Sequence, residues 1–181
     1  MMSQWQKGNQ VDLIGPLGRG FGIPSKDTSV FIVAGGMGLA PMISLFDHIY
    51  LPKTKIFFGA KTTEEVLALS KFIPKGTDNI IVSEDGKMGP PAPVTEAFKQ
   101  YVLSLNTTLE DYKCFACGPF AMLKEIGIFA NKMSLFCEIS LEEKMACGVG
   151  ACLGCVVKGT SGYIRTCKEG PVFNCREIMW D

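Results

Sequence analysis

The stretch that decides the fold is Ser29–Pro41, with the sequence SVFIVAGGMGLAP. Residues 30–34 are β-branched, aromatic or small, which is typical of a strand buried on both faces of a sheet. A glycine turn ends this run, and Pro41 stands where a helix can begin. A strand, a glycine turn and a helix in this order bring backbone N–H groups and the positive end of a helix toward a phosphate.

Apolar runs and helical patterns alternate along the rest of the first 140 residues. Strands are predicted at 11–15, 29–34, 55–60, 79–83, 112–117 and 134–139, and helices at 39–50, 63–69, 94–105 and 120–131. Strands that alternate with helices indicate right-handed βαβ units and a parallel sheet. The single histidine, His48, falls inside the first helical pattern, where packing or solvation is a commoner role than ligation.

The glycine turn meets a nucleotide-binding fingerprint only in part. Gly36 and Gly38 fit G-x-G-x-x-G, but Pro41 replaces the third glycine, and many α/β turns carry glycines for steric reasons alone. Ligands of parallel sheets bind outside the carboxyl ends of the strands. Residues 59–60, 84–86 and 117–119 fall at such ends. Turn chemistry accounts for each segment separately, but together with the glycine turn they outline one crevice.

Four cysteines after Leu141 follow the spacing C-x4-C-x2-C-x11-C, at Cys147, Cys152, Cys155 and Cys167. The first three have the spacing of plant-type [2Fe–2S] clusters. Glycines at 148, 150 and 154 can take the positive φ angles that a loop wrapped around a cluster needs. Backbone N–H groups in such a loop can also donate to sulfur. The pattern predicts a [2Fe–2S] site.

Other interpretations of the cysteines stay open. Four cysteines also suit tetrahedral zinc, although structural zinc sites usually contain two C-x2-C pairs and this chain has one. Disulfides are disfavoured because no signal peptide precedes them, and unrelated core cysteines leave the glycines unexplained. Cys114 and Cys137 lie in apolar strand patterns and are expected in the core. Cys175 is isolated and receives no role.

Composition sets the remaining bounds. The chain has 181 residues, which suits one domain or a small pair, with 47% hydrophobic and 20% charged residues. Its 18 basic and 18 acidic side chains cancel, which argues against a nucleic-acid partner. No apolar run approaches the ~20 residues of a membrane span. The N-terminus lacks the apolar stretch of a signal peptide, so we expect a cytoplasmic protein with reduced thiols.

The order of the motifs resembles the ferredoxin–NADP reductase superfamily, and within it the electron-transfer subunits of NAD-dependent dihydroorotate dehydrogenase. The motifs are VAGGMGLAP, FFGAK, SEDGKMG, CFACGPFAML and SLEEKMACGVGACLGC. The resemblance implies an α/β fold with a parallel-sheet, Rossmann-like NAD-binding domain at 28–139 and a small [2Fe–2S] domain at 140–181. Residues 1–27 would be the remnant of an FAD-binding β-barrel.

The resemblance also implies cofactors, partner and site residues. Electrons would pass between NAD(H), FAD, the [2Fe–2S] cluster and an FMN-containing dihydroorotate dehydrogenase catalytic subunit of pyrimidine biosynthesis, in a hetero-oligomer. The cluster ligands would be Cys147, Cys152, Cys155 and Cys167. The NAD site would comprise Gly35, Gly36, Met37, Gly38, Pro41, Asp85, Gly86, Cys117, Gly118 and Pro119. We expect no general acid or nucleophile; Cys117 is the one candidate near the nicotinamide, and packing explains it equally well.

One departure from the family concerns the flavin. In the family, the Arg-x-x-Ser strand and the Gly-Thr pair that bind the flavin precede the glycine-proline loop, which is Gly15–Phe21 here, and neither motif precedes this loop in the present sequence. The sequence predicts one strand in this N-terminal part, at 11–15, and a single strand cannot close a barrel. We therefore expect either an N-terminal truncation, which we favour, or a barrel supplied by another chain, and independent FAD binding is in doubt.

Two rival functions follow from the same residues. The first is the flavin and iron–sulfur subunit of another NAD(P)-linked oxidoreductase, of the ferredoxin–NADP transhydrogenase or sulfhydrogenase type. The second, outside the enzymes, is a zinc-stapled nucleotide-binding module. The choice of NAD or NADP is also open, because Glu64 and Glu65 disfavour a 2′-phosphate while Lys61 and Lys71 leave room for one.

Overall fold

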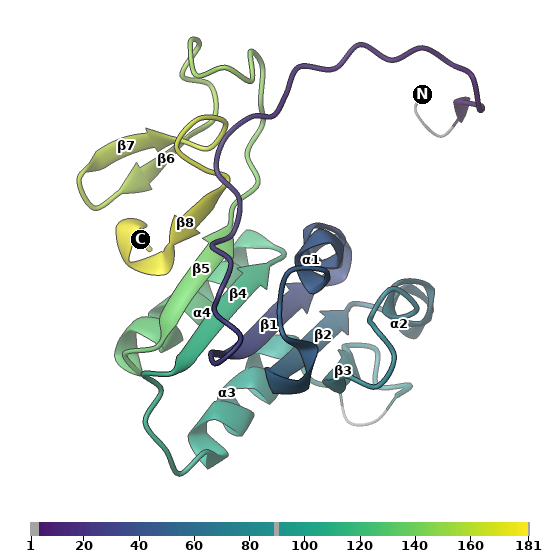
Figure 1. Ribbon diagram of the computed structural model, residues 1–181, viewed down its shortest axis with the longest axis vertical. Helices are drawn as coiled ribbons and strands as arrows, with labels where there is room; N and C mark the ends of the chain where they lie inside the picture. The colour runs from purple at the N-terminus through teal and green to yellow at the C-terminus, as the bar shows by residue number, and fades with distance from the viewer. Residues whose placement is uncertain (1–3, 89–90, 181) are drawn as a thin grey trace.

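The computed structural model describes residues 4–88 and 91–180 and places one large sheet at its centre (Figure 1). The sheet has the strand order β3-β2-β1-β4-β5-β8. Its strands are β1 (Ser29–Gly35), β2 (Thr54–Ala60), β3 (Asp78–Ser83), β4 (Tyr112–Cys117), β5 (Phe136–Ser140) and β8 (Val172–Asn174). The first five pair in parallel, and β8 pairs antiparallel with β5.

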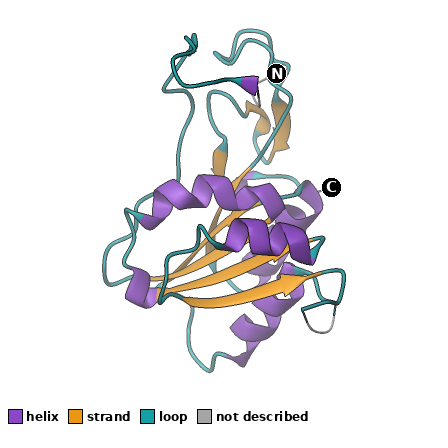
Figure 2. Cartoon of the chain, turned by 90° about the vertical axis from the view of Figure 1, so that its right-hand side faces the viewer, coloured by secondary structure: helices purple, strands orange, loops and turns teal. Residues whose placement is uncertain are grey.

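Helices cover both faces of this sheet (Figure 2). They are α1 (Leu39–Phe46), α2 (Thr63–Ser70), α3 (Val94–Ser104) and α4 (Phe120–Lys132), with short 3-10 turns η2 (Gly36–Gly38), η3 (Leu51–Lys53) and η4 (Cys175–Glu177). The alternation along β1 explains the three layers: Phe31 and Val33 join the core under α3 and α4, while Val30, Ile32 and Ala34 join the core under α1 and α2. The prediction of a strand buried on both faces is confirmed.

The order of the strands reverses between β1 and β4, so the chain leaves these two neighbours toward different sides. Ala34 is level with Phe58 of β2 on one side and with Cys117 of β4 on the other. The carboxyl ends of β1 and β4 therefore meet at the same edge. This is the position at which open α/β sheets bind ligands.

The predicted strands and helices of the α/β region are confirmed with small shifts, except at the end of α1. This helix stops at Phe46, because the N–H of His48 closes a turn on the carbonyl of Leu45. His48 therefore lies beyond the helix and is exposed, whereas the apolar spacing predicted it inside.

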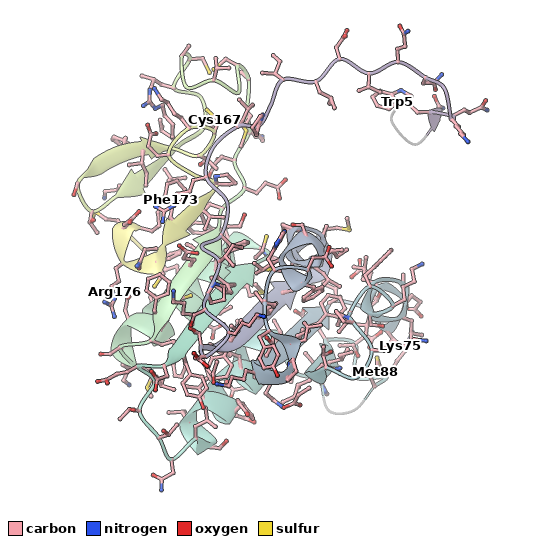
Figure 3. All side chains as sticks on the ribbon, in the orientation of Figure 1. Trp5, Lys75, Met88, Cys167, Phe173 and Arg176 are labelled. Atoms are coloured by element: carbon pink, nitrogen blue, oxygen red, sulfur yellow. The ribbon has the colours of Figure 1, made fainter. Side chains whose placement is uncertain are left out.

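The strand predicted at 11–15 is wrong. Residues 5–18 form no helix or strand, and Leu13 and Ile14 are 84% and 74% exposed. An isolated segment has no neighbour to complete its backbone hydrogen bonds, so apolar residues alone do not make it a strand. The segment projects from the molecule, with Trp5 near its far end (Figure 3). Residues 1–3 of the predicted barrel remnant lie outside the described residues.

The segment 19–22 returns to the molecule and crosses β5. The buried Glu138 carboxylate accepts a hydrogen bond from the N–H of Gly22 (2.7 Å) and lies 3.5 Å from the Arg19 guanidinium. Phe21 packs edge-on against Phe115 at 5.4 Å between ring centroids. Arg19 also forms a backbone bridge with Pro171. Residues 19–22 thus connect β5 with the C-terminal part of the chain.

The part that follows β5 contains the cysteine loop and a hairpin. Residues 147–155 contain no helix or strand, as predicted. The hairpin consists of β6 (Val156–Gly159) and β7 (Gly162–Arg165), which pair antiparallel. The chain then returns to the central sheet through β8, within the range predicted as the [2Fe–2S] domain.

Candidate cofactor sites

The glycine turn and the loop after β4 are packed backbone to backbone. A Cβ on Gly38 would stand 2.7 Å from the nitrogen of Gly118 and would collide with the carbonyl of Cys117. A Cβ on Gly35 would stand 3.0 Å from the ring of Pro119. These glycines are therefore required by the close approach of two loops, and the structure brings both predicted segments together at one sheet edge.

The outer surface of this junction is open. Among the described residues other than Gly36 and its two chain neighbours, no atom lies within 4 Å of the position that a Cβ of Gly36 would take, and Met37 is 72% exposed. The eight-residue α1 and the longer α4 both begin here, and neither has an acidic residue in its first turn. The positive ends of both helices are therefore not neutralised by carboxylates of their own first turns, which suits an anionic ligand. Pro41 lies in the first turn of α1, as predicted.

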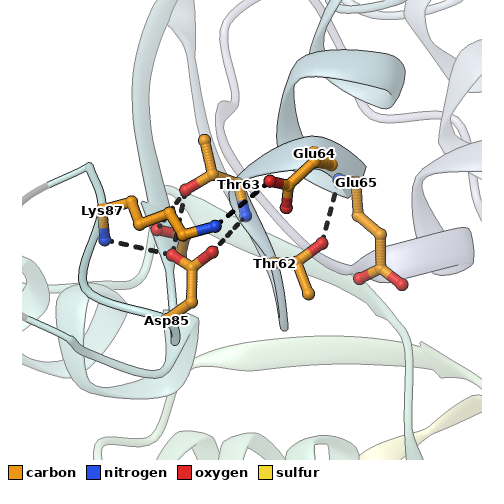
Figure 4. A network of polar contacts seen from close by, with 7 residues as sticks. Thr62, Thr63, Glu64, Glu65, Asp85 and Lys87 are labelled. Atoms are coloured by element: carbon orange, nitrogen blue, oxygen red, sulfur yellow. Dashed lines mark hydrogen bonds and ion pairs between the residues drawn. The ribbon is translucent and has the colours of Figure 1, made fainter.

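Asp85 and Gly86 follow β3, two strands away from β1, and Asp85 is engaged by α2 (Figure 4). The Asp85 carboxylate accepts hydrogen bonds from the N–H of Thr63 (2.8 Å), the hydroxyl of Thr63 (2.9 Å) and the N–H of Lys87 (3.1 Å). These bonds, with the Thr63 N–H first, hold the pKa of Asp85 well below its usual range. Asp85 therefore has a structural role, because two of its hydrogen-bond donors belong to Thr63 at the start of α2.

Cys117 is half-buried at the end of β4. Burial raises the pKa of its thiol, and the nearby Glu142 carboxylate adds to this effect. A raised pKa keeps the thiol protonated, which is unfavourable for a nucleophile.

The cysteine loop directs backbone N–H groups at its sulfurs. The Sγ of Cys147 accepts from the N–H of Cys152, the Sγ of Cys152 from Gly154, and the Sγ of Cys155 from Cys167, each at 3.4 Å. The first of these contacts is the largest cause that lowers the pKa of Cys147 to about 6. The thiolate is the form that binds metals, so the loop favours the ligand form of Cys147.

Backbone conformation in this loop differs in part from the prediction. Gly148 and Gly150 take φ angles of 71° and 80°, as expected. Leu153 also takes a positive φ of 57°, and its side chain is 59% exposed. Gly154, by contrast, serves through its N–H donated to Cys152. A leucine gives no sequence signal for a left-handed conformation, so this position was missed.

The four cysteines lie as two contacting pairs, Cys147 with Cys152 and Cys155 with Cys167. Among residues 4–88 and 91–180, no three histidine, cysteine or carboxylate side chains converge as a site for one metal ion. Four thiols and N–H groups directed at their sulfurs fit an iron–sulfur cluster in chemical type.

Two residues that the sequence analysis missed connect this site to its surroundings. Arg165 and Glu169 flank Cys167 at a spacing of two residues on either side and form an ion pair. Their i, i+4 spacing of opposite charges was the available signal, but outside a helix it has no predictive value.

The other cysteines belong to the core. Cys114 and Cys137 are level with each other on β4 and β5 and fully buried, as predicted. Cys175 is not isolated, which corrects the prediction. Its buried thiol lies 3.3 Å from the side-chain oxygen of Asn131, and hydrogen bonding with Cys137 raises its pKa.

The fold and the cysteine loop together define a class: a ferredoxin-reductase-like nucleotide-binding domain joined to an iron–sulfur module. Residues 142–179 match the family described as the iron–sulfur cluster binding domain of dihydroorotate dehydrogenase B. The chain is 35% identical over 187 residues to the dihydroorotate dehydrogenase B (NAD(+)), electron transfer subunit, of Desulforamulus reducens, covering 100% of this chain and 70% of the relative. The equally named protein of Caldanaerobacter subterraneus is 35% identical, with 99% and 70% covered.

The chain belongs to the family of electron transfer subunits of NAD-dependent dihydroorotate dehydrogenase B. Members are redox subunits of an oxidoreductase complex, and the family and fold imply an iron–sulfur cluster, FAD and NAD as cofactors. The predicted resemblance and α/β fold class are confirmed.

Solved structures agree with this fold. A structure of an NADH-dependent reduced ferredoxin-NADP oxidoreductase matches with a TM-score of 0.82 at 25% identity, covering 99% of this chain and 64% of that chain. The C-terminal domain of the PF1911 hydrogenase from Pyrococcus furiosus matches at a TM-score of 0.51 and 13% identity, which concerns the fold alone. The chain spans 64% of the ferredoxin-NADP oxidoreductase chain and 70% of the electron transfer subunit of Desulforamulus reducens. Within the described ranges, no helix is both long and apolar enough to cross a membrane.

Proposed function

We propose that this chain holds NAD(H) at the junction of β1 and β4 and a [2Fe–2S] cluster in the cysteine loop. It would thereby connect a nicotinamide to an FMN-containing catalytic subunit that oxidises dihydroorotate in pyrimidine biosynthesis. The observation that carries this proposal is the set of N–H groups directed at the cysteine sulfurs, on the same chain as the open glycine turn. We expect the chain to function in the cytoplasm, where thiols stay reduced.

At the nucleotide end, the chain's contribution is binding and orientation. We propose that Gly35, Gly36, Met37, Gly38 and Pro41 receive the pyrophosphate and nicotinamide region, beside Cys117, Gly118 and Pro119. The absence of acidic residues from the first turns of α1 and α4 supports this role. Asp85 and Gly86 would border the same edge, with Asp85 supporting α2. The NAD(+) in the names of the relatives favours NAD over NADP.

At the metal end, we propose Cys147 and Cys152 as one ligand pair and Cys155 and Cys167 as the other. A flavin can exchange a hydride with nicotinamide and single electrons with a cluster, which is the chemistry that FAD would supply between the two ends. The exposed position of Cys152 and the exposed side chains of Val149 and Leu153 support an approach of the catalytic subunit at this loop.

Isolation of the complex tests the proposal. The full chain, affinity-purified anaerobically from its own cells, should retain an FMN-containing partner, and dihydroorotate should reduce the cluster of this complex. The Cys152→Ser variant should keep the fold of its central sheet but lose this reaction with dihydroorotate. Retention of a partner without FMN would contradict the dihydroorotate function.

A second candidate follows from the similarity to the ferredoxin-NADP oxidoreductase structure. In that case the partner would be a flavoprotein that exchanges electrons with ferredoxin, and dihydroorotate would not reduce the complex. The higher identity to the dihydroorotate dehydrogenase subunits, 35% against 25%, favours the first function.

A further inference from the structure

Arg165 connects the two segments that carry the proposed cluster ligands. Its Nη1 donates a hydrogen bond to the carbonyl of Gly150 (3.0 Å), within the loop that contains the first three cysteines. Arg165 itself is the last residue of β7, two positions before Cys167. A Cβ on Gly150 would stand 3.5 Å from the Arg165 side chain and 2.9 Å from the stem of Lys168, so both side chains of this turn pack over the glycine, and Arg165 adds the hydrogen bond.

Glu169 fixes the position of this guanidinium. Its carboxylate accepts from the Arg165 Nε (3.0 Å) and backbone N–H (2.8 Å), and pairs with Nη2. The Arg165 carbonyl in turn accepts from the N–H groups of Lys168, Glu169 and Gly170. Both side chains are partly buried, at 28% and 37% exposure. The forked pair therefore closes the turn around Cys167 on both sides.

Charge adds a second effect to this geometry. The guanidinium, which is always charged in proteins, is fixed on the carbonyl of Gly150 in the loop of the first three cysteines and belongs to the residue two positions before Cys167. Glu169 pairs with this cation through its carboxylate, so two opposite charges are fixed beside Cys167. Net charge and hydrogen bonds near the sulfurs set the potential of an iron–sulfur cluster. A fixed cation stabilises the reduced, more negative form, and a nearby carboxylate opposes it.

We propose that Arg165, held by Glu169, is a positioning residue of the cluster site that joins the ligand loop to the turn at Cys167 and raises the cluster's reduction potential. This inference rests on the proposed [2Fe–2S] function. It assigns to the Arg165–Glu169 pair a role that differs from ligation, since neither residue supplies a sulfur.

Four variants of the full chain, reconstituted with iron and sulfide, separate charge from geometry. Arg165→Gln should lower the reduction potential of the cluster, and Glu169→Gln should raise it. Each substitution should change the equilibrium constant of electron exchange with a one-electron redox dye by about threefold; a tenfold change in that constant corresponds to ~59 mV. Arg165→Lys keeps the charge but loses the fork, so its potential should stay near that of the wild type while a chelator removes iron faster. Lys168→Gln removes an exposed charge from the same turn and should shift the potential less than Arg165→Gln.

The outcomes are distinguishable. A wild-type chain that binds no iron and sulfide would contradict the proposed function and this inference together. A wild-type cluster with shifts of the same sign in Arg165→Gln and Glu169→Gln, or with an equal shift in Lys168→Gln, would overturn the inference alone. If Arg165→Gln fails to hold a cluster while Lys168→Gln holds one, the positioning role is supported, and Glu169→Gln still tests the charge effect.

Discussion

Gly38 shows how one residue joins two loops of the nucleotide site. The absence of a Cβ at this position lets the glycine turn approach the backbone at Cys117 and Gly118. The same approach brings the starts of α1 and α4 to one edge. A side chain at residue 38 must therefore move the loop that we propose to bind the pyrophosphate.

Gly38→Ala should weaken NAD binding by about tenfold or more, because a displaced loop loses backbone contacts worth at least ~1.4 kcal/mol. Calorimetric titration of the full chain with NAD measures the change. Gly20→Ala is the matched control, since a Cβ there meets nothing within 4 Å. Equal affinity in Gly38→Ala and the wild type would place the nucleotide elsewhere.

Single residues also mark the limit of what the sequence could reveal. Spacing identified the four cysteines and the glycines at 148 and 150, because cluster loops constrain both. The positive φ of Leu153 and the buried position of Cys175 depend on neighbours distant in the chain, which no local pattern encodes. The Arg165–Glu169 pair likewise becomes recognisable only when the turn around Cys167 is folded.

At the scale of elements, α2 depends on a carboxylate that comes from the next strand. Thr62 caps the helix locally, accepting from the N–H of Glu65, and Asp85 adds two further bonds to Thr63. The carboxyl end of β3 is thereby tied to the start of α2.

Asp85→Asn should lower the melting temperature of the cluster-free chain by about 2–4 °C at pH 7, because an amide cannot accept all three bonds. The folded state lowers the pKa of Asp85, so its stabilisation is complete above the ordinary value of 3.8 and is lost as the pH falls through the lowered folded value. The difference in melting temperature between Asp85→Asn and the wild type should therefore be constant from pH 8 to about pH 5 and should disappear below about pH 4. Asp12→Asn, in the exposed N-terminal segment, is the control. A difference that widens at low pH would contradict this account.

The segment 19–22 is the second element that depends on a distant carboxylate. Glu138 on β5 accepts from Gly22 and pairs with Arg19, and no sequence pattern predicts such a contact across more than 100 residues. The short apolar stretch at 11–15 predicted a strand, but without a neighbouring strand the segment forms none and is exposed.

Glu138→Gln should accelerate tryptic cleavage after Arg19 by about tenfold, since hydrogen bonds to a charged group contribute roughly 1.5–3 kcal/mol to keeping a segment closed. Timed digestion with mass spectrometry gives the rate at this bond. Glu110→Gln, at an exposed position, should leave it unchanged. Cleavage at the wild-type rate in Glu138→Gln would show that the backbone bridge at Pro171 holds the segment alone.

At the scale of the whole molecule, the C-terminal part is both a module and a portion of the central sheet. The cysteine loop and the β6–β7 hairpin lie beyond β5, while β8 pairs with β5 at its edge. Strand and helix periodicity predicted the parallel core well, because burial on two faces leaves a strong pattern. The return of β8 was not predictable, because three residues carry no periodicity.

Cys152→Ser should remove or destabilise the cluster and loosen the segment from Leu141 to about Gly170, while β1–β5 and β8 stay protected. Hydrogen exchange measured on the loaded wild type and the variant separates these regions. Cys114→Ser, which removes a buried core thiol, should instead disturb the central sheet and spare the iron content. Full iron and sulfide content in Cys152→Ser would count against its assignment as a ligand.

The central claim is that the cysteine loop holds a two-iron cluster. The most direct test is the visible spectrum of the anaerobically purified chain, with iron, sulfide and zinc determined on the same sample. We predict charge-transfer bands with about two irons and two sulfides per chain. A colourless protein with one zinc per chain would contradict the claim and assign a structural role to the loop.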